Sequence, residues 1–390
     1  MENQHLNHPI HPSAWHALVV IQQTAVHAAL SQLFQKLGYQ NVKIVSDAVT
    51  AKALLLEQPF ALLVVDTMMA QEGGEALLDF ACQHTPATIR ALLSEVGDEQ
   101  SLLAITHSTQ LLLELPLQAS QLTDVWQRIS RLQQMPFSQH TRYQLGKVNT
   151  LPLLPRHYQT LLTLLADEQS STAALAASIA REAPLAAKLI QLANSAYLGF
   201  QRTTSDLNEV IVRLGRQRIR AVIFAVQLHH QYAARIRTDL HQQLLDNSYE
   251  LAMMASQLAK SQQAGGELVE KAFLAGLMQV LGPLVLLAEQ PLPLQQMTEE
   301  DMWQEGIPDH CVMSSYLLVL WGFEQDVCET VLYRLSLQQL SMPTLLHTIL
   351  HLSSYVLMYR RQQQDQSPEL CWSALEQFNL TDAFQRLQQV

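Results

Sequence analysis

The pattern of apolar residues changes once along the chain, near residue 150, and this change limits the folds that the sequence can adopt. Before it, short apolar runs alternate with amphipathic stretches. The runs are residues 16–21, 42–45, 61–66, 89–93 and 111–113, and the stretches are residues 25–37, 48–57, 76–82, 101–106 and 122–132. This alternation predicts a parallel β-sheet with helices on both faces. After residue 150, apolar residues recur at helical spacing only. We therefore expect an α/β domain followed by an all-α domain.

The same patterns divide the chain into five segments. We predict a disordered tail over residues 1–14, an α/β domain over 15–132, a linker over 133–149, a helical domain over 150–345 and a helical extension packed on that domain over 346–390. The linker is placed where the alternation stops and where Pro136 and Gly146 interrupt a polar stretch. A chain of 390 residues is also long for a single hydrophobic core, which agrees with at least two domains.

Composition and charge argue against several classes of function. A net charge of -11 disfavours extended binding to nucleic acid or to an anionic membrane. The most apolar stretch, residues 273–288, is interrupted by Gln279 and Pro283 and is too short to span a bilayer, so no membrane partner is expected. The cysteines are scattered, which predicts neither a zinc site nor a disulfide framework and favours the reducing cytoplasm. They are Cys82, Cys311, Cys328 and Cys371.

An aspartate ends the strongly apolar run Leu62–Asp66, which resembles the strand that presents the phosphoacceptor in receiver domains of bacterial response regulators. The resemblance implies a flavodoxin-like fold, a place in two-component signalling, Asp66 as phosphoacceptor and Ser94 as switch residue. Two positions depart from the receiver pattern. Gln22-Gln23 stands where receivers carry a Mg²⁺-binding acidic pair, and Leu115-Pro116 stands where they carry Lys-Pro. We therefore expect a pseudo-receiver that serves for docking or dimerisation, and a homodimer is left open.

Three stretches of the helical region resemble the HDOD family, an output-like domain related to HD hydrolases. They are Leu151–Pro155, Ala183–Tyr197 and Thr204–Gly215. The resemblance continues to about residue 345 and implies an all-helical HDOD domain that acts in bacterial signal transduction.

Five residues of these motifs have a direct physical interpretation. Pro184 suits the first turn of a helix, Asp206 suits an N-cap, and Gly215 suits a helix end. Asn194 and Ser195 lie near another helix end. We expect both to form capping hydrogen bonds within the fold, and ligand or partner binding is the alternative.

Metal-dependent HD enzymes hold their ions with histidine and aspartate, and the resemblance implies that most of those positions are substituted here. Asn247 replaces a His, Gln279-Val280 a His-Asp pair, Tyr333-Arg334 a pair that is often His-His, and Ser354 a final Asp, while His310 remains. Amide and apolar side chains are poor ligands for a divalent ion. His347 and His351 share one helix face at i, i+4 spacing but have no carboxylate beside them. We expect no metal, no cofactor and no catalytic residue.

Seven basic residues lie between Arg202 and Arg237, and four of them, Arg213, Arg216, Arg218 and Arg220, are close together. Arginine binds phosphate well, so a nucleic-acid surface is one interpretation. Few aromatic residues interleave with these arginines, which disfavours that interpretation. A solvated helix face and a surface for an acidic protein partner are the alternatives.

These features together predict a non-catalytic adaptor of bacterial signal transduction that acts through protein contacts in the cytoplasm. The resemblance to the HDOD family suggests a kinase or a cyclic-dinucleotide enzyme as the partner, because such proteins often occur together with members of this family. Two alternatives remain. The degenerate HD pocket, lined by Asn247, Gln279, Tyr333 and Arg334, could bind a nucleotide or another small molecule. The second alternative is a residual metal-dependent phosphohydrolase.

Overall fold

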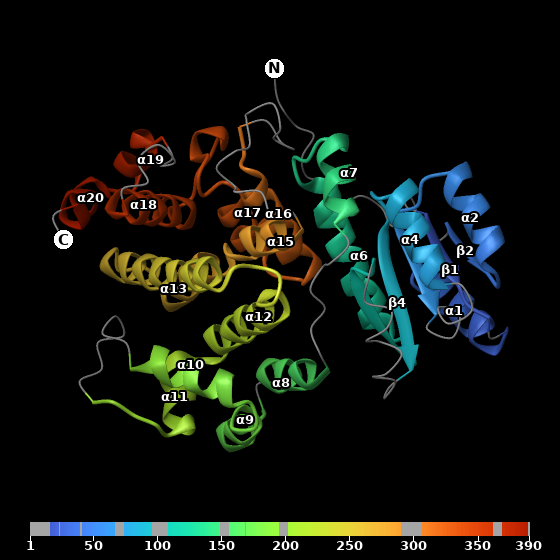
Figure 1. Ribbon diagram of the computed structural model, residues 1–390, viewed down its shortest axis with the longest axis horizontal. Helices are drawn as coiled ribbons and strands as arrows, with labels where there is room; N and C mark the ends of the chain where they lie inside the picture. Colours follow the sequence, from blue (N-terminus) through green and yellow to red (C-terminus); the bar gives the residue numbers. More distant parts are fainter. Residues whose placement is uncertain are drawn as a thin grey trace. The chain divides into compact units, whose positions relative to one another are not determined.

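The computed structural model describes residues 16–22, 24–39, 41–66, 74–95, 108–148, 156–167, 169–194, 202–289, 306–361 and 369–388. The chain divides into two compact units: residues 1–153 with Val319–Gly322 form the first, and residues 154–318 with 323–390 form the second, helical unit. The described part of the first unit contains the sheet, and the described part of the second is built from helices (Figure 1).

The first unit is built on a five-stranded parallel sheet. Its strands are β1 (Ala17–Val20), β2 (Val42–Val45), β3 (Leu62–Asp66), β4 (Ile89–Glu95) and β5 (Leu111–Leu115). Their spatial order is β2-β1-β3-β4-β5, which is the flavodoxin-like order of doubly wound sheets. Every residue of β1 and β3 is buried, so both faces of the central strands are covered. The five predicted strands and the fold class are confirmed.

Helices belong to the same unit, three of them between consecutive strands and two after the last strand among the described residues. They are α1 (Thr24–Lys36), α2 (Ala48–Glu57), α4 (Glu75–His84), α6 (Ala119–Gln134) and α7 (Gln139–Lys147). The Asp47 carboxylate caps α2 by accepting the Thr50 N–H at 2.8 Å. The buried stripe of α6 repeats every three or four residues, as Leu122, Val125, Trp126, Ile129 and Leu132. The helix predicted over residues 101–106 lies outside the described residues.

Helix α7 lies inside the segment 133–149 that the sequence predicts as a linker. The Arg142 guanidinium folds back on the end of α6 and donates to the carbonyls of Leu132 at 2.6 Å and Met135 at 2.9 Å. The Gly146 carbonyl accepts the Arg90 Nη2 at 3.0 Å, so α7 is joined to β4. A Cβ on Gly146 would lie 1.8 Å from the Pro86 carbonyl oxygen. Most of the predicted linker is therefore an integral helix of the first unit.

The second unit is all-helical over its described residues, apart from a short 3-10 turn at Leu337–Gln339. Its helices are α8 (Arg156–Ala166), α9 (Thr172–Ile179), α10 (Ala183–Ala193), α11 (Leu207–Leu214), α12 (Arg216–Tyr232), α13 (Thr238–Ser261), α14 (Gly266–Met278), α15 (Leu281–Glu289), α16 (Asp309–Leu320), α17 (Gln325–Leu332), α18 (Leu345–Arg360), α19 (Trp372–Gln377) and α20 (Thr381–Gln388).

Helices α13, α14 and α18 form the centre of this unit, and α13 lies beside α18 (Figure 1). Gly276 lets α14 approach α13 closely, because a Cβ there would lie 2.6 Å from the Ala252 Cα. At the C-terminal end, Phe384 of α20 packs edge-on against Tyr355 of α18, with ring centroids 5.8 Å apart. The last helices thus rest on the core of the helical unit.

One described stretch, Gly266–Glu289, is long and apolar enough to cross a membrane, with a mean hydropathy of 1.8. The 18-residue window that has this hydropathy is 83% buried within the helical unit. Since the core helix of a globular protein passes the same test, this stretch is weak evidence for a membrane span. Pro283 lies in the first turn of α15, a position that tolerates proline. Helix α14 ends at Met278 and α15 begins at Leu281, so the stretch contains two separate helices.

Candidate functional site

The carboxyl edge of the sheet brings together the predicted receiver positions. Asp66 ends β3 and pairs with Leu93 of β4, so Ser94 follows one residue later at the same edge. Gln22 follows β1, and Leu115 ends β5. Asp66 is 2% exposed. Along this edge the described residues offer a buried carboxylate, an amide and a leucine, where a receiver has acids and a lysine; Gln23 lies outside them.

The degenerate HD positions are distributed over α13 to α18. Gln279 caps the C-terminus of α14, and its carbonyl accepts the Ser314 hydroxyl of α16 at 2.9 Å. The same hydroxyl oxygen accepts the Gly282 N–H at 2.8 Å. A Cβ on Gly282 would lie 1.9 Å from the His310 carbonyl oxygen. The joint between α14 and α15 is therefore packed backbone-to-backbone against the start of α16.

His310 and Arg334 are brought close together at this joint. Burial, with a smaller contribution from the Arg334 charge, lowers the pKa of His310 to about 3. Arg334 is 7% exposed and also hydrogen-bonds the Cys311 side chain, whose pKa is raised by burial. A neutral imidazole can ligate a metal, but a neighbouring guanidinium repels a divalent cation in a poorly solvated site. Arg334 therefore offers no ligand to a metal ion and also opposes the binding of one through its charge.

The two histidines of α18 have structural partners. The Thr344 N–H donates to His347 Nδ1 at 3.1 Å, which completes a capping box at the start of the helix. His351 Nδ1 donates to the Arg334 carbonyl at 2.9 Å, and His351 Nε2 accepts the Cys371 N–H at 3.2 Å. Burial lowers the pKa of both rings, to about 4 for His347. Their i, i+4 spacing is explained by these contacts.

The remaining predicted positions offer little to an ion. Val280 and Ser354 are buried, Asn247 is half-buried on α13, and Tyr333 is half-buried at the C-cap of α17. Burial raises the pKa of the Tyr333 hydroxyl, and Glu329 adds to this effect. Across the described residues, no group of three His, Cys, Asp or Glu side chains could hold a metal. The structure thus brings His310, Arg334 and His351 into one chain of contacts without a metal-ligand set.

The motif residues of the helical unit act as helix caps. Pro184 lies in the first turn of α10. Asn194 caps the end of α10, donating to the Thr204 carbonyl and accepting the Thr204 N–H, both at 2.8 Å. The Asp206 carboxylate accepts the Asn208 N–H at 2.9 Å, and Gly215 ends α11 with a φ of +79°. Asn194 thus forms hydrogen bonds within the fold, while Ser195 and residues 151–155 lie outside the described residues.

Three of the four clustered arginines are held within the fold. Arg213 pairs with Glu209 at 2.5 Å. Arg216 donates to the carbonyls of Leu164 at 2.9 Å and Ser170 at 2.5 Å, so it clamps the α8–α9 connection. Arg220 stacks over the Phe323 ring, 5.6 Å from its centroid. These contacts leave little of the predicted basic surface for nucleic acid.

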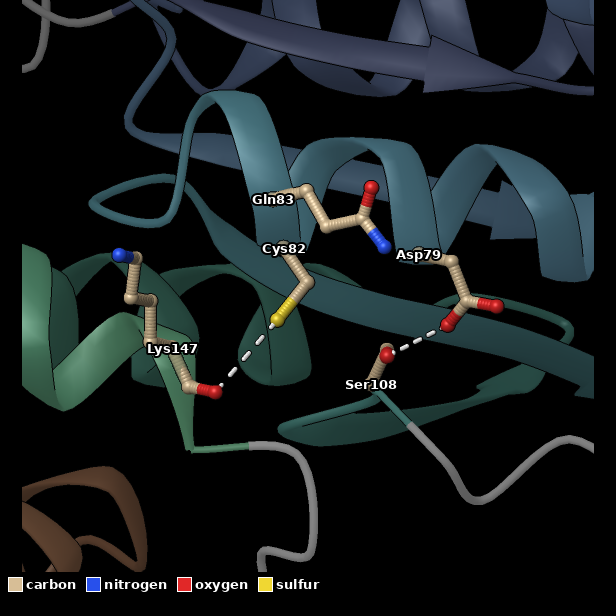
Figure 2. A pocket seen from close by; sticks show the side chains of 5 residues that line it. All are labelled: Asp79, Cys82, Gln83, Ser108 and Lys147. Atoms are coloured by element: carbon tan, nitrogen blue, oxygen red, sulfur yellow. Dashed lines mark hydrogen bonds between the residues drawn. The ribbon is translucent and has the colours of Figure 1, made fainter.

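The structure also contains a cavity that the sequence does not predict. It has a volume of about 320 Å³ and lies in the first unit, lined by Asp79, Cys82, Gln83, Ser108 and Lys147. Figure 2 shows the Ser108 hydroxyl donating to Asp79 at 2.6 Å and the Cys82 thiol directed at the Lys147 carbonyl. Ser108 precedes β5, so the cavity lies at the amino edge of the sheet, away from Asp66. Its residues come from three separate segments, and no local motif marks them.

The family model of the HDOD domain matches residues 151–336. The helical unit contains an HDOD domain. Its presence supports a role in signal transduction. An uncharacterized protein of Treponema pallidum is 22% identical over 199 residues, which is 47% of this chain, and the chain spans 37% of the length of that relative.

Several solved structures are similar to parts of the chain. An HDOD domain protein of unknown function from Geobacter sulfurreducens is 18% identical, with 59% of this chain and 79% of that one covered and a TM-score of 0.43. A protein from Marinobacter aquaeolei that carries the name of a signal transduction protein is 17% identical, covering 69% and 63%, with a TM-score of 0.43. A protein from Shewanella amazonensis that carries the name of a phosphohydrolase is 19% identical, covering 65% and 93%, with a TM-score of 0.44.

Proposed function

We propose that the protein is a non-catalytic adaptor of bacterial signal transduction that works in the cytoplasm through protein–protein contacts. In this proposal the HDOD domain binds a downstream partner, and the sheet unit serves as an input or docking module. A kinase or a cyclic-dinucleotide enzyme is the class of partner that we propose. The observation that carries the proposal is the buried Arg334 guanidinium beside His310.

This observation has a direct chemical consequence. An HD hydrolase needs a divalent ion to activate water and to polarise the phosphoryl oxygens. A cation fixed near the remaining histidine opposes that ion, and burial of Arg334 limits the screening of its charge by water. The amide of Gln279 and the apolar Val280 contribute no negative charge to offset it. A packed helical unit whose described residues offer no metal-ligand set supports a binding role in place of catalysis.

The non-catalytic part of the proposal is tested by metal analysis of the full-length protein. After dialysis against Mn²⁺ or Ni²⁺, we expect sub-stoichiometric metal by plasma mass spectrometry and no turnover of phosphomonoesters or phosphodiesters. An Arg334→Gln variant separates the two causes, because it removes the charge but restores no ligand. Stoichiometric metal and a hydrolysis rate that both disappear in a His310→Ala variant would establish the enzyme alternative.

The adaptor part is tested by affinity capture with the full-length chain and surface variants. Three exposed apolar side chains report on different faces: Val212 and Met342 on the helical unit, which are 76% and 83% exposed, and Val49 on α2, which is 79% exposed. Each is changed singly to Glu, and the exposed, ion-paired Arg237→Gln serves as the control. We expect a specific protein that is lost with a helical-unit variant and kept by the control. Loss only with Val49→Glu would assign docking to the sheet unit.

A further inference from the structure

Arg218 is a buried member of the clustered arginines, and among the described residues its guanidinium is only partly hydrogen-bonded. It lies in the first turn of α12 and is 7% exposed. Its Nη2 donates to the Ser256 hydroxyl oxygen at a long 3.4 Å, and its guanidinium lies over the Phe273 ring at 5.2 Å from the centroid. Among the described residues, its Nε has no hydrogen-bond partner. Buried guanidinium groups are ordinarily paired.

A second cation lies near Arg218 and increases the local positive charge. Lys260 is exposed at the end of α13, one turn after Ser256, so the two side chains share a helix face. Burial lowers the pKa of Lys260, and the Arg218 charge lowers it further. Ser256 links the two cations, since it accepts from Arg218 at 3.4 Å and lies one turn before Lys260 on α13.

The charged groups around Arg218 and Lys260 determine the net charge of this cluster. Glu270 of α14 is the acid that acts on Arg218, and its contribution raises the arginine pKa while burial lowers it. One acid against two cations leaves a net positive charge. Arg218 also lies at the N-terminus of a 17-residue helix, where the helix dipole adds partial positive charge. An anion is therefore favoured here, and a cation is not.

We propose that Arg218, Ser256 and Lys260 bind the phosphate group of a small molecule. The guanidinium and the ammonium would each donate to phosphate oxygens, and the Ser256 hydroxyl can donate its proton while its oxygen accepts from Arg218. Tight burial of Arg218 favours a compact anion over the acidic face of a large partner. Free phosphate and a phosphate monoester share this chemistry, and this proposal does not depend on the adaptor function.

The proposal is tested by isothermal titration of the full-length protein with orthophosphate and with adenosine monophosphate, against chloride at equal ionic strength. Lys260→Gln is the main variant, because the exposed lysine can be changed without loss of the fold. Arg218→Gln is the second, with its folding checked by circular dichroism. Arg237→Gln is the matched control, since Arg237 is exposed and paired with Asp239. We expect Lys260→Gln to weaken phosphate binding roughly tenfold to hundredfold, as for one charge-assisted hydrogen bond, and the control to leave it unchanged.

Each outcome decides for or against the site. Binding of adenosine monophosphate much tighter than orthophosphate would identify a phosphate monoester as the source, and equal binding would identify free phosphate. The proposal is overturned if wild type binds neither anion beyond the chloride reference, or if Lys260→Gln binds as tightly as wild type. Binding of a phosphoserine peptide alone would replace the small molecule with a protein partner and also overturn it.

Discussion

Replacing Gly146 by alanine should loosen α7 from the sheet unit. The new Cβ would lie 1.8 Å from the Pro86 carbonyl oxygen and 2.3 Å from its carbon. Both are backbone atoms, so no side-chain rotation relieves the overlap. Ordinary contact starts near 3.4 Å, so the two backbones must separate by about 3.4 − 1.8 = 1.6 Å. This movement is transmitted directly to the hydrogen bonds that Gly146 accepts.

The expected destabilisation follows from these contacts. The Gly146 carbonyl accepts Arg90 Nη2 at 3.0 Å and the Cys82 thiol at 3.5 Å, and a shift of that size breaks the first bond. A hydrogen bond from a charged group contributes about 1.5–3 kcal/mol, and overpacking costs about 1–3 kcal/mol. Alanine regains about 1 kcal/mol in a helix interior. We expect the free energy of unfolding of the first unit to fall by about 2–4 kcal/mol.

Urea denaturation of the full-length protein, followed by circular dichroism, measures the effect, and hydrogen exchange assigns it to α7. The matched control is Gly266→Ala at the first residue of α14, where no atom lies within 4 Å of the new Cβ. That change should be neutral or stabilising by up to about 1 kcal/mol. If Gly146→Ala and Gly266→Ala unfold at the same urea concentration, with equal protection of the α7 amides, the packing argument is refuted.

Two further predictions concern titration and phosphorylation. The pKa of His347 is about 4 in the fold, below its ordinary 6.5, so the unfolded chain binds more protons between these values and stability falls as the pH drops from 6.5 to 4. A His347→Gln variant can keep the capping box and should lose less stability over this window in urea titrations; an unchanged slope would contradict this. Acetyl phosphate should leave Asp66 unmodified, since the carboxylate is buried and the positions of its receiver partners hold Gln22 and Leu115. Mass spectrometry would show the reverse if wild type, but not Asp66→Asn, gained a phosphate.

Sequence patterns correctly predicted the parts of the fold that depend on neighbouring residues in the chain, such as apolar strands and helix caps. The strand Leu62–Asp66 was identifiable because burial on both faces requires an unbroken apolar run. The caps at Asn194 and Asp206 follow from short side chains beside helix ends. Helix α7 was missed because its segment is polar and its contacts are made with other elements: Arg90 of β4 donates to the Gly146 carbonyl, and Arg142 of α7 donates to the Leu132 carbonyl of α6.

In the candidate site, too, some features follow from single residue types and others only from tertiary packing. Substitution of the metal ligands was visible at single positions such as Gln279, because the residue type alone decides whether it can bind an ion. The charge that Arg334 places beside His310 required the packing of α16 against the end of α17. The cavity beside Asp79 and Ser108 also required the fold, since the two residues are 29 positions apart.

His351 has a consequence for the C-terminal helices. Its ring donates from one nitrogen to Arg334 and accepts at the other from Cys371, the residue that precedes α19. Only the neutral Nδ1–H tautomer can do both, because a protonated ring would present a second N–H to the Cys371 N–H. The hydrogen bond from Cys371 to the core therefore depends on the absence of one proton, whereas the Phe384–Tyr355 contact of the same segment does not. Burial lowers the pKa of this ring, and so keeps this hydrogen bond in place through the neutral pH range.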